Sequence, residues 1–159
     1  MKRSLFAVAV ALGACTPPAS ETETAAPETT EAAPVDPAIA AAVEAAMPGV
    51  RITSGAADGV DEYEVTGLLG GQEYEFDLMG PNWRVVEIQR DIAWGDAPTP
   101  VRDLVATAPN GFLPERVIES RQPVDGSVVY ELFAPGAPDA PTMEVRFIDG
   151  QAAIMPPAH

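Results

Sequence analysis

The chain has 159 residues and a formal net charge of −15, and its 17 prolines and 13 glycines indicate short elements joined by many turns. Such a charge repels nucleic acid, so no nucleic-acid partner is expected. Cys15 is the single cysteine, the only histidine is His159, and the only lysine is Lys2. Catalytic nucleophiles that depend on His, Cys or Lys therefore cannot be assembled, and neither can zinc sites built on His or Cys. We expect a protein that is not an enzyme and holds no cofactor.

The N-terminus has the features of a bacterial lipoprotein signal. A positive start at residues 2–3 precedes an apolar run at 5–12, which is too short to span a bilayer. Leu12-Gly13-Ala14-Cys15 then resembles a lipobox, in which the cysteine receives lipid before cleavage. Residues 1–14 are predicted to be a signal peptide and Cys15 the membrane anchor. The alternative is an ordinary signal peptide with a chance cysteine.

The location that follows is the cell envelope, on the periplasmic side. Thr16 follows the modified cysteine, where an aspartate typically retains Gram-negative lipoproteins in the inner membrane. The outer membrane is therefore favoured. Residues 15–36 are rich in Pro, Ala, Thr and Glu and offer almost nothing to bury, so they are predicted to form a disordered acidic tether.

The rest of the chain shows a weak internal repeat. Residues 58–65 align with 125–132, each an Asp-Gly turn followed by a Tyr-Glu strand, and 74–78 align with 143–147. Two units are predicted, at residues 37–92 and 93–159.

Each unit is expected to open with a helix of about three turns. Asp36 and Thr99 are suitable N-caps, and each precedes a proline at the first helical position. Apolar residues then recur at helical spacing as far as Met47 and Ala108.

Antiparallel strands are expected to follow each helix. Residues 73–78 alternate between apolar side chains and carboxylates, and 143–147 alternate similarly. Gly70-Gly71 and Asp149-Gly150 are hairpin turn signals. Residues 83–88 and 151–155 are predicted to be closing strands, and 89–98 the connection between units. The predicted fold is α+β: two helix-plus-antiparallel-strand repeats forming a sheet, with two short helices packed on one face.

This order of elements resembles the PepSY superfamily, and the tandem arrangement is similar to its beta-lactamase-inhibitor-like group of bacterial envelope proteins. The resemblance covers about residues 37–155, and a Pro-x-x-Val helix opens the second unit, as in that group. It implies a secreted, non-enzymatic domain that binds, or inhibits, another envelope protein such as a peptidase. We expect this domain to be a monomer. No metal or active-site motif is implied.

Two further sets of residues are candidates for binding. Four acids cluster near a turn without matching an EF-hand loop, which favours an ordinary charged hairpin, and the alternative is a weak calcium site: Asp58, Asp61, Glu62 and Glu64. A calcium site would make the chain a structural or calcium-sensing lipoprotein.

The tryptophans are the other candidates, because tryptophan is enriched where partners bind. Trp94 either plugs the seam between the two units or is an exposed anchor for a partner, whereas Trp83 is expected in the core. A set of four aromatic side chains either lines a binding face of the sheet or is buried under the helices: Tyr63, Tyr74, Phe76 and Tyr130.

Overall fold

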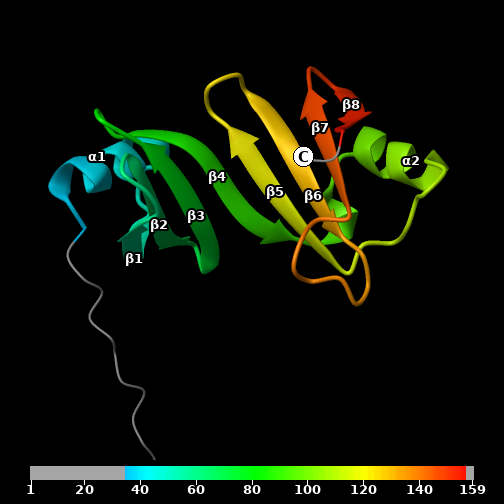
Figure 1. Ribbon diagram of the computed structural model, residues 1–159, viewed down its shortest axis with the longest axis horizontal. Coiled ribbons are helices and arrows are strands. Elements are labelled where there is room, and N and C mark those ends of the chain that lie inside the picture. The colour runs from blue at the N-terminus through cyan, green and yellow to red at the C-terminus, as the bar shows by residue number, and fades with distance from the viewer. Residues whose placement is uncertain (1–34, 157–159) are drawn as a thin grey trace, which may run out of the picture. The chain divides into compact units, whose positions relative to one another are not determined.

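A single antiparallel sheet of eight strands runs through the part of the chain that the structure, a computed structural model, describes: residues 35–156. The predicted signal peptide, the lipidation site Cys15, Thr16 and most of the tether lie outside the described residues. The strands pair in chain order, so the sheet is a meander (Figure 1). The strands are β1 (Arg51–Ala57), β2 (Glu62–Leu69), β3 (Gln72–Met79), β4 (Arg84–Ile92), β5 (Arg116–Gln122), β6 (Ser127–Phe133), β7 (Met143–Ile148) and β8 (Gln151–Ile154).

Two helices and one 3-10 turn complete the described chain: α1 (Pro37–Ala46), η1 (Trp94–Asp96) and α2 (Thr99–Thr107). The predicted cap of α1 is confirmed, because the Asp36 carboxylate accepts a hydrogen bond of 2.7 Å from the Ala38 amide. The prediction for α2 is wrong by one residue. Pro98 occupies the N-cap position without a side-chain cap, and Thr99 begins the helix.

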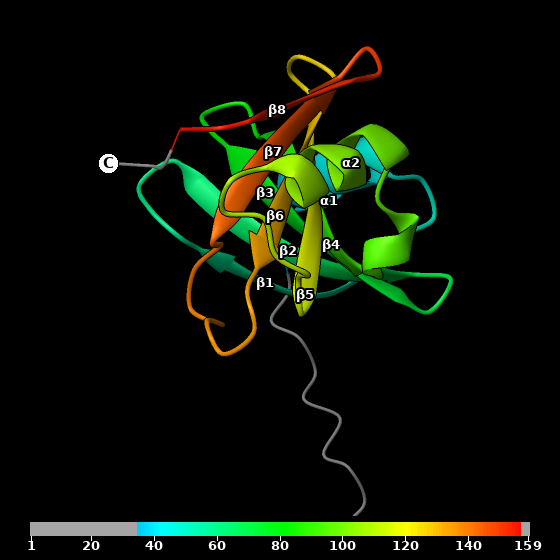
Figure 2. The ribbon, with the colours of Figure 1, turned by 90° about the vertical axis from the view of Figure 1, so that its right-hand side faces the viewer.

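Both helices pack on the same face of the sheet. Ile39 and Val43 of α1 are buried against β2, β3 and β4, and Val101 and Val105 of α2 are buried against β5, β6 and β7. The apolar side chains that α1 covers alternate with the polar ones on the opposite face, as the period of a strand requires. Figure 2 shows α2 on the near side of β5, β6 and β7.

The two apolar clusters are separated by charged side chains where β4 meets β5. Arg90 donates to both carboxylate oxygens of Glu119, at 2.9 and 3.2 Å, and Arg121 donates to the same carboxylate at 2.9 Å. Only 12% of the Glu119 side chain is exposed, so this ion pair is largely shielded from water. The seam between the clusters is therefore held by charge-assisted hydrogen bonds, not by a tryptophan.

The predicted fold class is wrong. The structure is mainly β, one continuous eight-stranded sheet with two helices, and not an α+β fold of two helix-and-strand repeats. The error lies in residues 89–98, which were expected to connect two units. Gln89 to Ile92 belong instead to β4 and pair with Val117 to Ser120 of β5. This pairing joins all the strands into one sheet.

Other boundaries agree closely with the sequence pattern. The alternating segment 73–78 lies within β3, and Gly70-Gly71 forms the β2–β3 turn with both glycines at positive φ. Trp83 differs from the prediction, since it precedes β4 and lies in a turn with φ of 20°. Neither helix in residues 35–156 is long and apolar enough to cross a membrane.

Candidate functional site

The open face of the sheet, the side away from α1 and α2, is lined with carboxylates. Phe76 and Leu78 of β3 are buried beneath α1, so their neighbours Glu75 and Asp77 point to the opposite side. The same alternation places further acids there from β2, β4, β6 and β7. We define the open face by six residues: Glu64, Glu75, Asp77, Glu87, Glu131 and Glu144.

Register brings three of these acids into one row across three strands. Glu64 of β2 is paired with Asp77 of β3, and Asp77 is paired in turn with Glu87 of β4. Directly opposite like charges destabilise a sheet. The chain therefore carries an electrostatic cost at this row.

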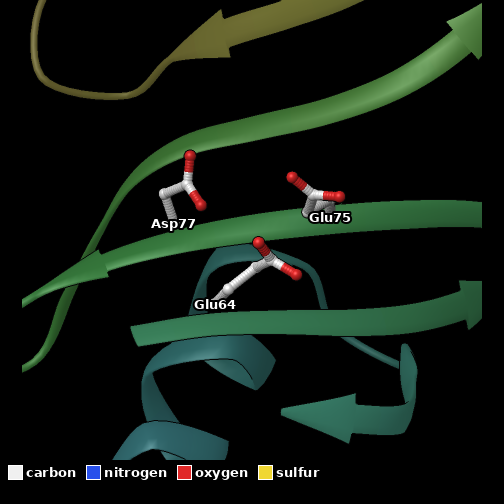
Figure 3. A group of neighbouring side chains, drawn as sticks. All are labelled: Glu64, Glu75 and Asp77. Carbon is white, nitrogen blue, oxygen red and sulfur yellow. The ribbon is translucent and has the colours of Figure 1, made fainter. Parts of the chain in front are cut away.

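A tighter group forms on β2 and β3. Carboxylate oxygens of Glu64, Glu75 and Asp77 all lie within 4.8 Å of one another, and each residue is half-buried. Figure 3 shows the three side chains rising from the two strands on the same side of the sheet. No other group of three such ligands occurs within residues 35–156.

Burial and repulsion together make these acids easier to protonate. Burial, followed by the charges of Glu87 and Glu64, raises the pKa of Asp77 to about 6. The pKa of Glu75 is also raised, first by burial and then by Glu64 and Asp77. Part of the negative charge is therefore lost in mildly acidic solution.

A second pair of opposed acids lies across β6 and β7. Glu131 is paired with Glu144, and burial is the largest cause that raises the pKa of Glu131 to about 7. The charges of Glu87 and Glu144 add to this shift, and Arg116 opposes it. The carboxylates of the open face thus interact over several strands.

One arginine on this side, Arg116, is already engaged. Arg116 donates to both oxygens of Asp91, at 2.7 and 3.1 Å, and its guanidinium lies 5.3 Å from the centre of the Phe133 ring. Glu87 accepts hydrogen bonds from Ser120 and from Gln122, the latter at 3.1 Å. Neither contact neutralises the row of Glu64, Asp77 and Glu87.

Chemically, this face is an array of hydrogen-bond acceptors with excess negative charge. It can accept bonds from guanidinium or ammonium groups, or supply oxygen ligands to a hard cation. The cluster of Glu64, Glu75 and Asp77 could hold a metal ion such as Ca²⁺, which takes six to eight oxygens, only with additional ligands from solvent or a partner.

The four acids predicted from the sequence to bind calcium do not converge. Asp58, Asp61 and Glu62 are exposed around the β1–β2 turn. Glu64 is the exception, since it joins Glu75 and Asp77. Sequence reasoning missed these two because it followed neighbours along the chain, whereas the cluster depends on pairing between strands.

Both tryptophans are half-buried. Trp83 packs against the first apolar cluster with its ring edge-on to Tyr63, at 6.0 Å between centroids. Trp94 packs against the second cluster and lines a groove beside α2. The four aromatic residues singled out in the sequence lie on the helix side of the sheet. Phe76 and Tyr130 are buried, and Tyr63 and Tyr74 are half-buried.

Comparison with known proteins shows a likeness in fold. A crystal structure of a DUF2874 family protein from Bacteroides uniformis matches with a TM-score of 0.53 and 19% sequence identity. The match covers 78% of this chain and 87% of that one. At this identity the likeness concerns the fold alone. No family model matches this chain, and no curated protein matches it.

Proposed function

We propose that this chain is a non-enzymatic, lipid-anchored protein of the cell envelope, facing the periplasm, that binds a basic segment of another envelope protein. The partner is of the kind that the PepSY-like resemblance implies, such as a peptidase that the binding inhibits. The observation that carries the proposal is the row of Glu64, Asp77 and Glu87, three carboxylates at directly opposed positions on adjacent strands.

The cost of this row favours a partner that removes it. Each opposed pair destabilises the free protein, and an incoming arginine or lysine converts that repulsion into attraction. Half-buried carboxylates gain more from such a partner than fully exposed ones, because solvent screens them less.

The extent of the charge favours a protein segment over a single ion. The acids lie on β2, β3, β4, β6 and β7, and neighbouring strands are about 4.8 Å apart. A single ion contacts only the group formed by Glu64, Glu75 and Asp77. An extended segment with several basic residues can lie across the sheet and engage Glu131 as well.

The test distinguishes the effect of carboxylates at the open face from the effect of the net charge of the chain. The probe is a labelled ten-residue peptide with arginine at alternate positions, titrated into the full chain. The double variant Asp77→Asn with Glu131→Gln should weaken binding at least tenfold at pH 7.5. The control, Asp96→Asn with Asp139→Asn, removes the same charge from exposed sites and should change affinity less than twofold. Equal losses in both variants would show non-specific attraction and defeat the proposal.

The anchor is tested separately. Cys15→Ala should move the protein from the membrane fraction to the soluble fraction. If Cys15→Ala stays with the membrane, lipidation at this residue is excluded.

A second candidate function is calcium binding, favoured by the approach of Glu64, Glu75 and Asp77 oxygens to within 4.8 Å. Calcium at millimolar concentration should then raise the melting temperature, and chelator or Asp77→Asn should remove the rise. A flat response would eliminate this candidate and leave the partner-binding proposal intact.

A further inference from the structure

A groove beside α2 lies on the helix side of the sheet, away from the open face. It has a volume of about 510 Å³, and its walls come from α2, from η1 and from the loop that follows α2. Trp94, Phe112 and Leu113 supply its apolar surface. Leu113 is 71% exposed, so this apolar wall of the groove is open to solvent.

The loop that forms one wall is fixed closely to the helix. The Gly111 amide donates to the Ala108 carbonyl at 2.9 Å. A side-chain carbon at Gly111 would lie only 2.1 Å from the Val105 carbonyl oxygen, so only glycine permits this approach. This wall of the groove is therefore fixed before any ligand arrives, which reduces the entropic cost of binding.

Three polar residues line this groove: Arg102, Thr99 and the exposed Asp103. Of these, Arg102 has incomplete hydrogen bonding. Its Nε is buried and has no partner, the only such side-chain nitrogen or oxygen among residues 35–156. Its Nη2 donates to the Thr99 hydroxyl at 3.3 Å, a long contact. Arg102 also makes no salt bridge with any described residue.

Other arginines of the same chain show what this edge of the guanidinium binds. Arg90 and Arg116 each use Nε together with Nη2 to hold both oxygens of a carboxylate. In Arg102 the same edge has no carboxylate. A buried donor without an acceptor is unfavourable, so Arg102 gains by turning towards an incoming carboxylate.

We propose that this groove binds a partner-protein segment in which an aspartate or glutamate stands next to a large apolar residue. The carboxylate accepts two hydrogen bonds from Nε and Nη2 of Arg102. The apolar side chain packs between Trp94 and Leu113. Sites for small molecules enclose most of their ligand, whereas a wall as exposed as Leu113 suits a segment of a protein.

This site differs in charge preference from the open face. The open face attracts basic groups, while the groove offers an arginine to acidic ones on the other side of the sheet. Because the whole chain is acidic, salt should weaken a basic ligand at the open face and should not weaken an acidic ligand at the groove.

The experiment is a selection of random twelve-residue peptides displayed on phage against the full chain, at 0.3 M salt to suppress binding to the open face. Enriched peptides should share an acid beside Leu, Ile, Phe or Trp. Synthetic copies should lose at least tenfold in affinity with Arg102→Gln and with Leu113→Ser. Replacing the peptide's acid by its amide should cause a similar loss.

Two control variants change charges outside the groove. Arg51→Gln removes an exposed arginine on β1, and Asp77→Asn with Glu131→Gln alters the open face. Both should leave peptide affinity within twofold, which also separates this site from the proposed function. Arg102→Gln removes an unpartnered donor and should melt no lower than the parent chain. Absence of an acidic-apolar motif, or binders indifferent to Arg102→Gln, would overturn the proposal.

Discussion

Asp77 and Glu87 occupy directly opposite positions on β3 and β4, so two carboxylates meet across one cross-strand pair. Glu64 extends the same row on the other side of Asp77. A sheet selected for stability alone would place opposite charges or apolar residues at such positions. The arrangement is understandable if the face serves a partner that supplies the missing positive charge.

Removing one charge from the centre of this row should stabilise the free protein. Asp77→Asn keeps the size of the side chain and relieves repulsion with both neighbours, so the free energy of unfolding at pH 7.5 should rise by about 0.5–1 kcal/mol. Urea denaturation measures the change. Asp96→Asn, at an exposed site in η1, is the control and should have little effect. A clear loss of stability in Asp77→Asn would contradict the repulsion.

Stability should rise as the solution is acidified from pH 7.5 to pH 5. Asp77 and Glu131 have pKa values raised from 3.8 to about 6 and from 4.5 to about 7, so in this range the folded chain binds more protons than the unfolded chain. Stability therefore falls as pH rises through the window from about 4 to about 7. Asp125 does not oppose this trend within the window, because its pKa is lowered by its bonds to Ser127.

Thermal denaturation between pH 5 and pH 7.5 measures this dependence. The melting temperature should be a few degrees higher at pH 5, and the double variant Asp77→Asn with Glu131→Gln should flatten the profile. A profile of the parent chain that rises steadily with pH would show that these acids are not perturbed as described.

The ion pair at the seam should contribute more than the exposed ones. Glu119→Gln leaves Arg90 without its carboxylate in a site where only 12% of the Glu119 side chain is exposed, and it should cost about 1.5–3 kcal/mol. Asp91→Asn is the matched control. It breaks the pair with Arg116, whose side chains are 51% and 59% exposed, and should cost less than about 1 kcal/mol. Equal costs would mean that the seam depends on packing alone.

Gly111 should be intolerant of any side chain. Gly111→Ala places a carbon against the Val105 carbonyl oxygen and should cost about 1–3 kcal/mol through displacement of the loop. Gly95→Ala, where no atom lies within 4 Å of the added carbon, should be nearly neutral. Calorimetry of both variants tests the close approach, and a neutral Gly111→Ala would contradict it.

The elements of this fold could largely be read from local patterns. The Asp36 cap and the Gly70-Gly71 turn follow from neighbouring residues, and the structure confirms both. The end of β4 could not be read in this way. Arg90 is a strand residue that faces the helix side, where an alternating pattern would place an apolar residue. Its charge is compensated by Glu119, which is 29 residues away, so nothing in the neighbouring sequence marks Arg90 as part of a strand.

The candidate site was recognisable only in part. The alternation of Glu75 and Asp77 with apolar neighbours predicts a carboxylate face, and the structure confirms that the two lie on one side. Their meeting with Glu64 and Glu87 depends on strand register, which a bulge between Asp77 and Leu78 also shifts. Arg102 gave no signal in the sequence, because an unpaired nitrogen is visible only once its surroundings are folded.

Binding of a basic segment should weaken in acid if the open face is the site. Protonation of Asp77 near pH 6 and of Glu131 near pH 7 removes the charges that attract the segment. The affinity of the arginine-containing probe peptide should therefore fall several-fold from pH 7.5 to pH 5.5. The variant Asp77→Asn with Glu131→Gln, measured by the same titration, should show little further loss. A pH-independent affinity would place the binding elsewhere.

If the open face contacts a partner in the cell envelope, as proposed, site-specific photo-crosslinking in living cells should capture that partner. A photoreactive residue at Gln89, half-buried on the open face between Glu75 and Ser120, should give one discrete crosslinked protein. The same residue at Ala41, exposed on α1, should not give it, and Asp77→Asn with Glu131→Gln should reduce the Gln89 product strongly. No discrete product from Gln89, or the same product from Ala41, would exclude the open face as the binding surface.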